Sequence, residues 1–188
     1  MLSQIDQAEA SPAIPLPADP PQFTKVVVTG IFRTGLQARY GADVRDLPGG
    51  PVFGTQIIEP LDRPGQDPLL VDRGWMPLGS VAPPGNGTVD GYVRVPDHPG
   101  LFSARDNPAA RTFYTLDPAA IGASLGLARV APFTLVALGQ VKPGVLPQPA
   151  TALPRPPNDH LNYALTWFGL ALSLAVVFAV YTRKALRP

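Results

Sequence analysis

The chain of 188 residues contains two histidines, and His160 lies at the start of a long apolar run. If the run is helical, Ala164, Trp167 and Ala171 follow at spacings that place them on the same side as His160. Neutral imidazole is a common axial ligand of haem iron, and an apolar groove beside it can accept a porphyrin. The alternative is that His160 and Trp167 are interfacial anchors, since such side chains are frequent at membrane boundaries. The spacing alone does not decide between the two roles.

A second polar group occurs in VDRGWMP, which contains Asp72, Arg73 and Trp75. These side chains could form a polar site, but the pattern favours a strand that ends in a glycine turn with a half-buried Trp75. We expect Arg73, Gly74 and Trp75 to form a structural motif in which a positive φ at Gly74 aims Trp75 inward.

Signatures of common catalytic sites are absent from the sequence, including HExxH, GxSxG and GxxxxGK[ST]. The glycines of GNGTVDG precede a strand and predict a hairpin turn, and His98, between Pro96 and Pro99, is predicted to be an exposed turn residue. Without cysteine, the chain has no disulfides, thiolate metal sites or cysteine nucleophiles. Lys plus Arg number 15 against 14 for Asp plus Glu, a balance that argues against a dedicated nucleic-acid surface.

The apolar run predicts a transmembrane helix. Residues 161–181 carry no charge, and at about 1.5 Å per residue they span about 31 Å, close to the hydrocarbon thickness of a bilayer. A helix of a globular core is usually shorter and amphipathic, whereas this run is apolar on every face. We predict a membrane helix over 158–182 and a basic cytoplasmic tail over 183–188, because positive charge after the run favours the inner side.

Short β-rich segments separated by Gly and Pro predict a mainly β domain over residues 22–141. TVDGYVRV alternates with the period of a sheet that has one wet face, and Asp117 before Pro118 predicts the start of one short helix. We expect a small antiparallel domain that curls toward a barrel to hide its edges. The predicted strands are Phe23–Phe32, Phe53–Glu59, Leu69–Trp75, Thr88–Val95, Thr112–Leu116 and Phe133–Val141.

Proline-rich segments flank the predicted domain on both sides. Residues 142–157 hold six prolines and predict a stiff, extended tether of the polyproline kind. The N-terminal segment 1–21 resembles a second such tether. Because the basic residues after the apolar run favour the inner side, the domain that precedes the helix is predicted to lie on the outer side of the membrane.

Four blocks, in order, resemble a known family: LLVDRGWMP, TVDGYVRVP, TFYTLDPAAIGASLGL and NDHLNYALTWFGLA. They are similar to the successive blocks of the Surfeit locus protein family, membrane-bound assembly factors of cytochrome c oxidase. The resemblance covers residues 22–184. The RGW block followed by HLxYALTWFGLA is a specific combination rather than a common short motif.

The resemblance implies that the chain is not an enzyme but helps haem a to reach the core subunit of the oxidase. The expected partners are that core subunit, the machinery that makes haem a and membrane lipid, in a cell or mitochondrial inner membrane. The family's link with haem a makes the histidine that opens its second helix the candidate ligand of the haem iron. This histidine corresponds to His160, and Trp167 would pack against the macrocycle.

The resemblance departs at the start of the chain. Family members usually begin with a transmembrane helix and a Trp-Gln block, whereas MLSQIDQAEASPAIPLPADP corresponds to a start after both. A misassigned start codon, a truncated sequence and a true loss of the helix are the three explanations. The last requires a single C-terminal span to export the whole domain.

A hypothesis of a different class is a membrane-tethered structural subunit that stabilises an oxidase complex without binding haem. Small residues on the apolar run permit close contact with another helix, which serves either hypothesis. They are Gly169, Ala171, Ser173, Ala175 and Ala179.

Overall fold

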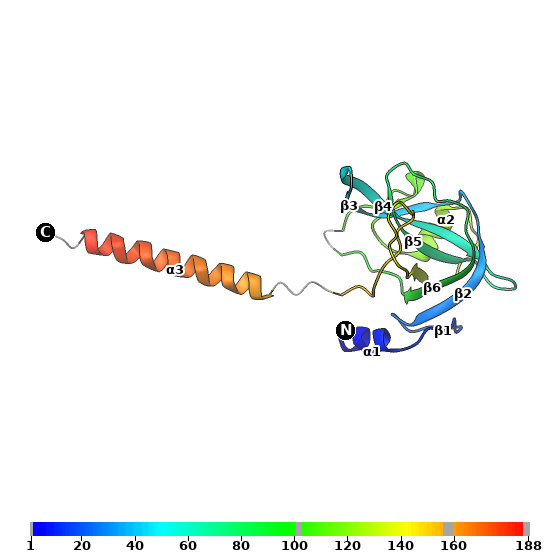
Figure 1. The fold of residues 1–188 in the computed structure, drawn as a ribbon, viewed down its shortest axis with the longest axis horizontal. Coiled ribbons are helices and arrows are strands. Elements are labelled where there is room, and N and C mark those ends of the chain that lie inside the picture. Colours follow the sequence, from blue (N-terminus) through cyan, green and yellow to red (C-terminus); the bar gives the residue numbers. More distant parts are fainter. Residues whose placement is uncertain (1, 101–102, 156–159, 186–188) are drawn as a thin grey trace. The chain divides into compact units, whose positions relative to one another are not determined.

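The computed structural model describes residues 2–100, 103–155 and 160–185. The secondary structure falls into two units that meet in the sequence between Leu153 and Pro154 (Figure 1). The elements are α1 (Leu2–Ala10), β1 (Ile14–Pro15), β2 (Lys25–Phe32), β3 (Ala38–Leu47), β4 (Gly50–Asp62), β5 (Leu69–Pro77), β6 (Asn86–Arg94), the 3₁₀ turn η1 (Pro108–Ala110), β7 (Thr112–Phe113), α2 (Pro118–Ser124), β8 (Thr134–Ala137) and α3 (His160–Ala185).

Five strands close into a barrel in the order β2, β6, β8, β5 and β4. The junction between β4 and β2 closes it, with Ile31 opposite Asp62 and Phe32 opposite Leu61. Only the β5–β8 junction of the barrel is parallel. Closure satisfies the backbone groups that an open edge would leave free. The predicted fold class is confirmed: a mainly β, largely antiparallel, barrel-like domain with a C-terminal apolar helix.

Strand β6 shows how the barrel separates two packed layers. Val93 is fully buried in a cluster to which all five barrel strands contribute. On the other face Thr88 and Asp90 are exposed, as the alternation predicts, but Tyr92 is only 4% exposed. The expected wet face is therefore wrong at Tyr92, because the outer wall there is covered by a second cluster that includes Ile5 of α1.

Strand β3 was not predicted from the sequence, because Gly35 and Gly41 suggest breaks in the chain. Gly41 has φ of 66° and lies in an irregularity between Tyr40 and Asp43, where β3 bends but continues its pairing with β4. Strand β3 also pairs with β7, outside the barrel. The other predicted strands are present with shifted ends, and the last two are shorter than expected.

The N-terminal segment differs from the extended tether expected over 1–21. Its first part lacks proline and forms α1, and Ile5 is fully buried against a cluster that contains Phe23 and Tyr92. The Lys25 ammonium donates a hydrogen bond to the Glu9 carbonyl in the last turn of α1, at 2.9 Å. Apolar contact and this cap therefore hold the segment on the barrel.

Most of the second proline-rich segment also lies on the barrel. We call residues 142–153 the strap. Its Gln148 exchanges two backbone hydrogen bonds with Trp75, of 2.8 and 2.9 Å, and Ala150 accepts one from Gly139. Leu153 is 5% exposed. The segment expected to be a free tether is thus a covering layer of the first unit, because strand β5 offers it an unpaired edge beyond the end of β8.

The two remaining helices agree with the sequence. Asp117 caps α2, its carboxylate accepting from the backbone N–H groups of Ala119 and Ala120, and Pro118 occupies the first turn. Helix α3 has an apolar window of mean hydropathy 2.0, none of it buried, so its length and composition suit a membrane span. Residues 156–159 and 186–188, which include the end of the expected tether, the first two residues of the expected span and the end of the basic tail, lie outside the described residues.

Strand β5 contains a bulge at the motif RGW. Ile57 of β4 pairs with Gly74 and Ile58 with Asp72, so Arg73 is an extra residue. Gly74 has φ of 118°, as expected, and a Cβ there would collide with the backbone of Gln148 in the strap.

We expect Gly74→Ala to lower the free energy of unfolding by about 2 to 4 kcal/mol, from backbone strain and collision together. Gly79→Ala is the matched control, because Gly79 has φ of 81° and open space around its missing Cβ. It should cost only about 1 kcal/mol. Chemical denaturation measures both, and equal losses would show that the strap does not constrain Gly74.

Candidate functional site

The first candidate site is the N-terminal part of α3. His160 is the first residue of the helix and is exposed, and Trp167 is 69% exposed. At about 100° per residue, seven residues bring Trp167 back to within about 20° of the direction of His160. The structure thus confirms the shared helix face, while the ligand role stays a prediction.

The donor chemistry of this face fits a haem better than a bare metal ion. No cluster of three or more His, Cys, Asp or Glu side chains that could hold a metal is present in the described ranges. A haem iron already has four ligands from its macrocycle and needs only an axial donor, which one imidazole supplies. His160 fits this requirement, and the exposed indole of Trp167 offers an apolar surface for a flat ring.

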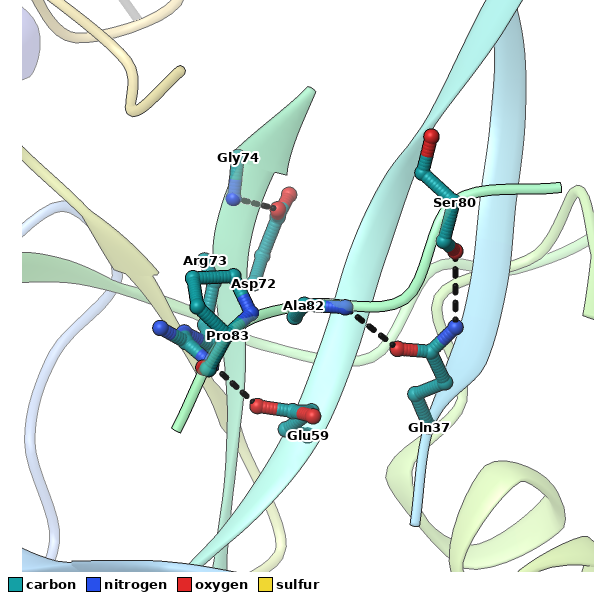
Figure 2. Close-up of polar contacts among 8 residues, drawn as sticks. All are labelled: Gln37, Glu59, Asp72, Arg73, Gly74, Ser80, Ala82 and Pro83. Atoms are coloured by element: carbon teal, nitrogen blue, oxygen red, sulfur yellow. Dashed lines mark hydrogen bonds and ion pairs between the residues drawn. The ribbon is translucent and has the colours of Figure 1, made fainter. Parts of the chain in front are cut away.

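The second candidate site, around Arg73, belongs to the barrel unit. The Arg73 guanidinium donates from Nη1 to Glu59 Oε2 and to the Pro83 carbonyl (Figure 2). It also lies 4.6 Å from the Phe32 ring centroid. Glu59 is fully buried, and its Oε1 has no hydrogen-bond partner within the described part of the chain. Arg73 therefore provides the counter-charge for a carboxylate that water does not reach.

The loop between β5 and β6 is held over this ion pair by Gln37. Its side-chain amide donates to the Ser80 carbonyl at 3.2 Å and accepts from the Ala82 N–H at 3.1 Å (Figure 2). Pro83 belongs to the same loop and accepts from Arg73. The polar contacts near Arg73 thus fix a loop and a buried charge, as a structural motif would.

Trp75 is more buried than the sequence suggests. It was expected to be half buried and is fully buried, because β3 and the strap cover it. Its indole N–H donates to the Asp43 carbonyl at 3.3 Å, and the Arg45 guanidinium lies 5.2 Å from its ring centroid. Gly54 makes room for the indole, since a Cβ there would collide with it.

Asp72 takes part neither in the Arg73–Glu59 ion pair nor in the polar contacts that hold the loop between β5 and β6. Its carboxylate accepts from the Gly74 N–H at 3.0 Å and lines a small polar cavity with Arg45 and Arg94. Burial raises the pKa of Asp72 to about 7, against the smaller lowering effects of the Gly74 hydrogen bond and of the two arginines. The structure therefore does not bring Asp72, Arg73 and Trp75 into one polar site.

The residues that sequence analysis missed are polar groups inside apolar strands. Glu59 was placed in a predicted strand without a role, although a lone acid in IIEPL is a signal that a partner is needed. Tyr40, Tyr92 and Arg94 gave no such signal, because their convergence depends on β3 lying over the barrel wall.

A β-barrel unit followed in the sequence by an exposed apolar helix is the architecture of a β-domain protein with a candidate membrane anchor. The model of the SURF1 family matches residues 1–172, and the chain belongs to this family.

Individual relatives agree with this assignment. "Surfeit locus protein 1" of Arabidopsis thaliana is 24% identical over 227 residues, covering 89% of this chain and 62% of the relative. A "SURF1-like protein" of Monosiga brevicollis is 24% identical over 179 residues, covering 87% of this chain and 67% of the relative. One of Rickettsia conorii is 67% identical over 27 residues, which are 14% of this chain and 11% of the relative. The chain thus spans less than two thirds of the length of the Arabidopsis protein.

Breaking the buried ion pair should destabilise the barrel strongly. Arg73→Met leaves Glu59 buried without a counter-charge and should lower the free energy of unfolding by about 3 to 5 kcal/mol. The double variant Arg73→Met/Glu59→Met should recover most of the loss, because no charge is then buried. Urea denaturation of both proteins measures their free energies of unfolding, and a double variant as unstable as the single one would contradict the charge argument.

The stability of the barrel unit should fall as pH rises through the titration range of Asp72. Because folding raises this pKa from 3.8 to about 7, the native state binds the proton more tightly, and stability present at pH 4 is lost by pH 7, on the order of 4 kcal/mol.

Asp72→Asn removes this titration and should flatten the pH dependence of thermal unfolding. Asp46→Asn, at an exposed position of β3, is the control and should leave the slope unchanged. If the parent and Asp72→Asn proteins have parallel profiles from pH 4 to pH 8, Asp72 does not titrate in this range.

Proposed function

We propose that this chain is an assembly factor of cytochrome c oxidase that assists the insertion of haem a into the core subunit at the membrane. Membership of the SURF1 family supports the oxidase context. The observation that carries the haem step is the position of His160, which opens an exposed apolar helix with Trp167 on the same side.

His160 would hold the haem through one imidazole nitrogen as an axial ligand, and Trp167 would pack against the macrocycle. The seven-position separation of His160 and Trp167 corresponds to about 10 Å along the helix axis. Because both side chains are exposed on one helix, haem held by them would stay accessible to a partner protein. The bound haem supplies the redox-active iron, and the chain binds and presents it.

In this proposal α3 spans the inner membrane, the β unit lies on the outer side, and Arg183 and Lys184 lie on the cytoplasmic side or its equivalent. The positive-inside rule supports this orientation. The partners are the oxidase core subunit, the haem a synthesis machinery and the surrounding lipid. The role is not enzymatic: the chain acts by binding.

His160→Ala, made in the full-length protein as its organism produces it, should lower the amount of copurified haem a and change its visible spectrum, because the axial ligand is lost. Oxidase assembly in the same cells should fall. His98→Ala is the matched control, since His98 is the other histidine and is exposed in the β unit. It should leave haem content, spectrum and assembly unchanged.

Trp167→Ala should weaken haem retention by up to about 3 to 5 kcal/mol through lost packing. Phe168→Ala, also exposed but about 100° away on α3, should not. A His160→Ala protein with parental haem content, spectrum and oxidase assembly would refute the ligand role. If assembly fell in the α3 variants while no form of the protein carried haem, the structural-subunit hypothesis would replace it.

A further inference from the structure

A small polar cavity lies on the outer wall of the barrel, under β3 and the strap. Its volume is about 180 Å³, equivalent to about six water molecules of liquid. Strand β3 contributes Tyr40 and Arg45 to its lining, and the barrel wall contributes Asp72, Tyr92 and Arg94. The proposed haem site on α3 does not use this cavity, although two of the blocks that carry the family resemblance supply Asp72, Tyr92 and Arg94 to its lining.

Two deeply buried polar side chains in this cavity keep free hydrogen-bonding capacity. Tyr92 is 4% exposed, and no residue in the described part of the chain gives its hydroxyl a hydrogen bond. Asp72 is 6% exposed, and of its two carboxyl oxygens only Oδ1 has a partner there, the Gly74 N–H. Neither oxygen is among the enclosed unpaired atoms of the described residues, which are Glu59 Oε1, Arg63 Nε and Thr134 Oγ1, so a ligand or solvent in the cavity can reach both.

Hydrogen-bond donors outnumber acceptors around this space. The Arg45 guanidinium donates to Gln148 Oε1 at 2.8 Å and to Asp43 Oδ2 at 3.3 Å, the Arg94 guanidinium donates to Asp97 Oδ1 at 2.6 Å, and each has further N–H groups. The Gln56 amide also lines the cavity. Both arginines are already paired with a carboxylate, so what they offer a ligand is their remaining N–H groups, which an acceptor-rich ligand with several oxygens would satisfy.

We propose that the cavity binds a small oxyanion, a carboxylate or phosphate group, whose oxygens accept hydrogen bonds from Arg45, Arg94 and the Tyr92 hydroxyl. The volume limits the ligand to the size of inorganic phosphate or a short dicarboxylate. Because the strap forms one wall through Ala150, an occupied cavity also ties the strap to the barrel.

Asp72 makes this binding dependent on pH. Its protonated carboxyl can donate to an anion, whereas its ionised form repels one. The other groups that face it are Arg45 and Tyr40 from β3, and Tyr92 and Arg94 from β6. Burial raises the pKa of Tyr40 and raises the pKa of Tyr92 to about 12, and arginine stays charged, so Asp72 is the group of this set that changes charge near neutral pH.

The test is isothermal titration calorimetry of the full chain in detergent at pH 6, with inorganic phosphate in one series and succinate in another. We expect saturable binding of one molecule per chain, and the tighter series identifies the class of oxyanion. Tyr92→Phe removes one hydrogen bond to a charged ligand and should weaken binding about tenfold. Tyr114→Phe, at an exposed tyrosine outside the cavity, should have the parental affinity.

A pH series completes the test. The parent protein should lose affinity between pH 6 and pH 8, and Asp72→Asn should keep its affinity at pH 8, because the neutral amide adds no repulsion. Thermal unfolding verifies that each variant is folded. The absence of saturable binding in both series, or equal weakening by Tyr92→Phe and Tyr114→Phe, would overturn the proposal and indicate that the cavity holds only water.

Discussion

The approach of the Gln148 backbone to Gly74 is the contact on which the first unit depends. Beyond β8, strand β5 would have a free edge, and the strap takes that edge with two hydrogen bonds to Trp75. Only a residue without a Cβ permits this approach. The same contact buries Trp75 and completes one wall of the polar cavity. One glycine thus links the bulge in β5, the strap and the polar cavity.

Strand β5 also separates charges that are neighbours in the sequence. Arg73 binds the buried carboxylate of Glu59 and the loop before β6, whereas Asp72 lines a cavity together with Arg45 and Arg94. In a regular strand the two side chains would also point to opposite faces. The extra residue adds a change of direction for Trp75, which then lies under β3. The short motif DRGW therefore contributes Arg73 to a buried ion pair and to a loop contact, and Asp72 to the wall of the cavity.

Local patterns predicted the elements whose causes are local. The cap at Asp117, the positive φ of Gly74 and the length of α3 follow from the residues themselves, and the structure has all three. The burial of Tyr92 and Trp75 depends on segments far away in the sequence, which alternation cannot reveal. Proline content suggested extended tethers, yet tertiary contacts decided the position of the strap.

The candidate site on α3 could be read from the sequence because helical spacing alone places His160 and Trp167 together. The convergence of Tyr40, Asp72 and Arg94 could not, since it requires the crossing of β3 over the barrel wall. Glu59 could have been noticed in the sequence as a charged residue within an apolar run. Its pairing with Arg73 could not, because it depends on the register of β4 and β5, which cannot be read from the sequence.

The junction of β2 and β4 closes the barrel through two residue pairs, whereas β2 pairs with β6 from Lys25 to Ile31. Few hydrogen bonds must break together at this seam, so its local opening should cost less free energy than the parting of β2 from β6. Phe32 belongs to the seam and lies against Arg73. Parting of β2 from β4 would therefore also disturb the packing around the buried Arg73–Glu59 ion pair.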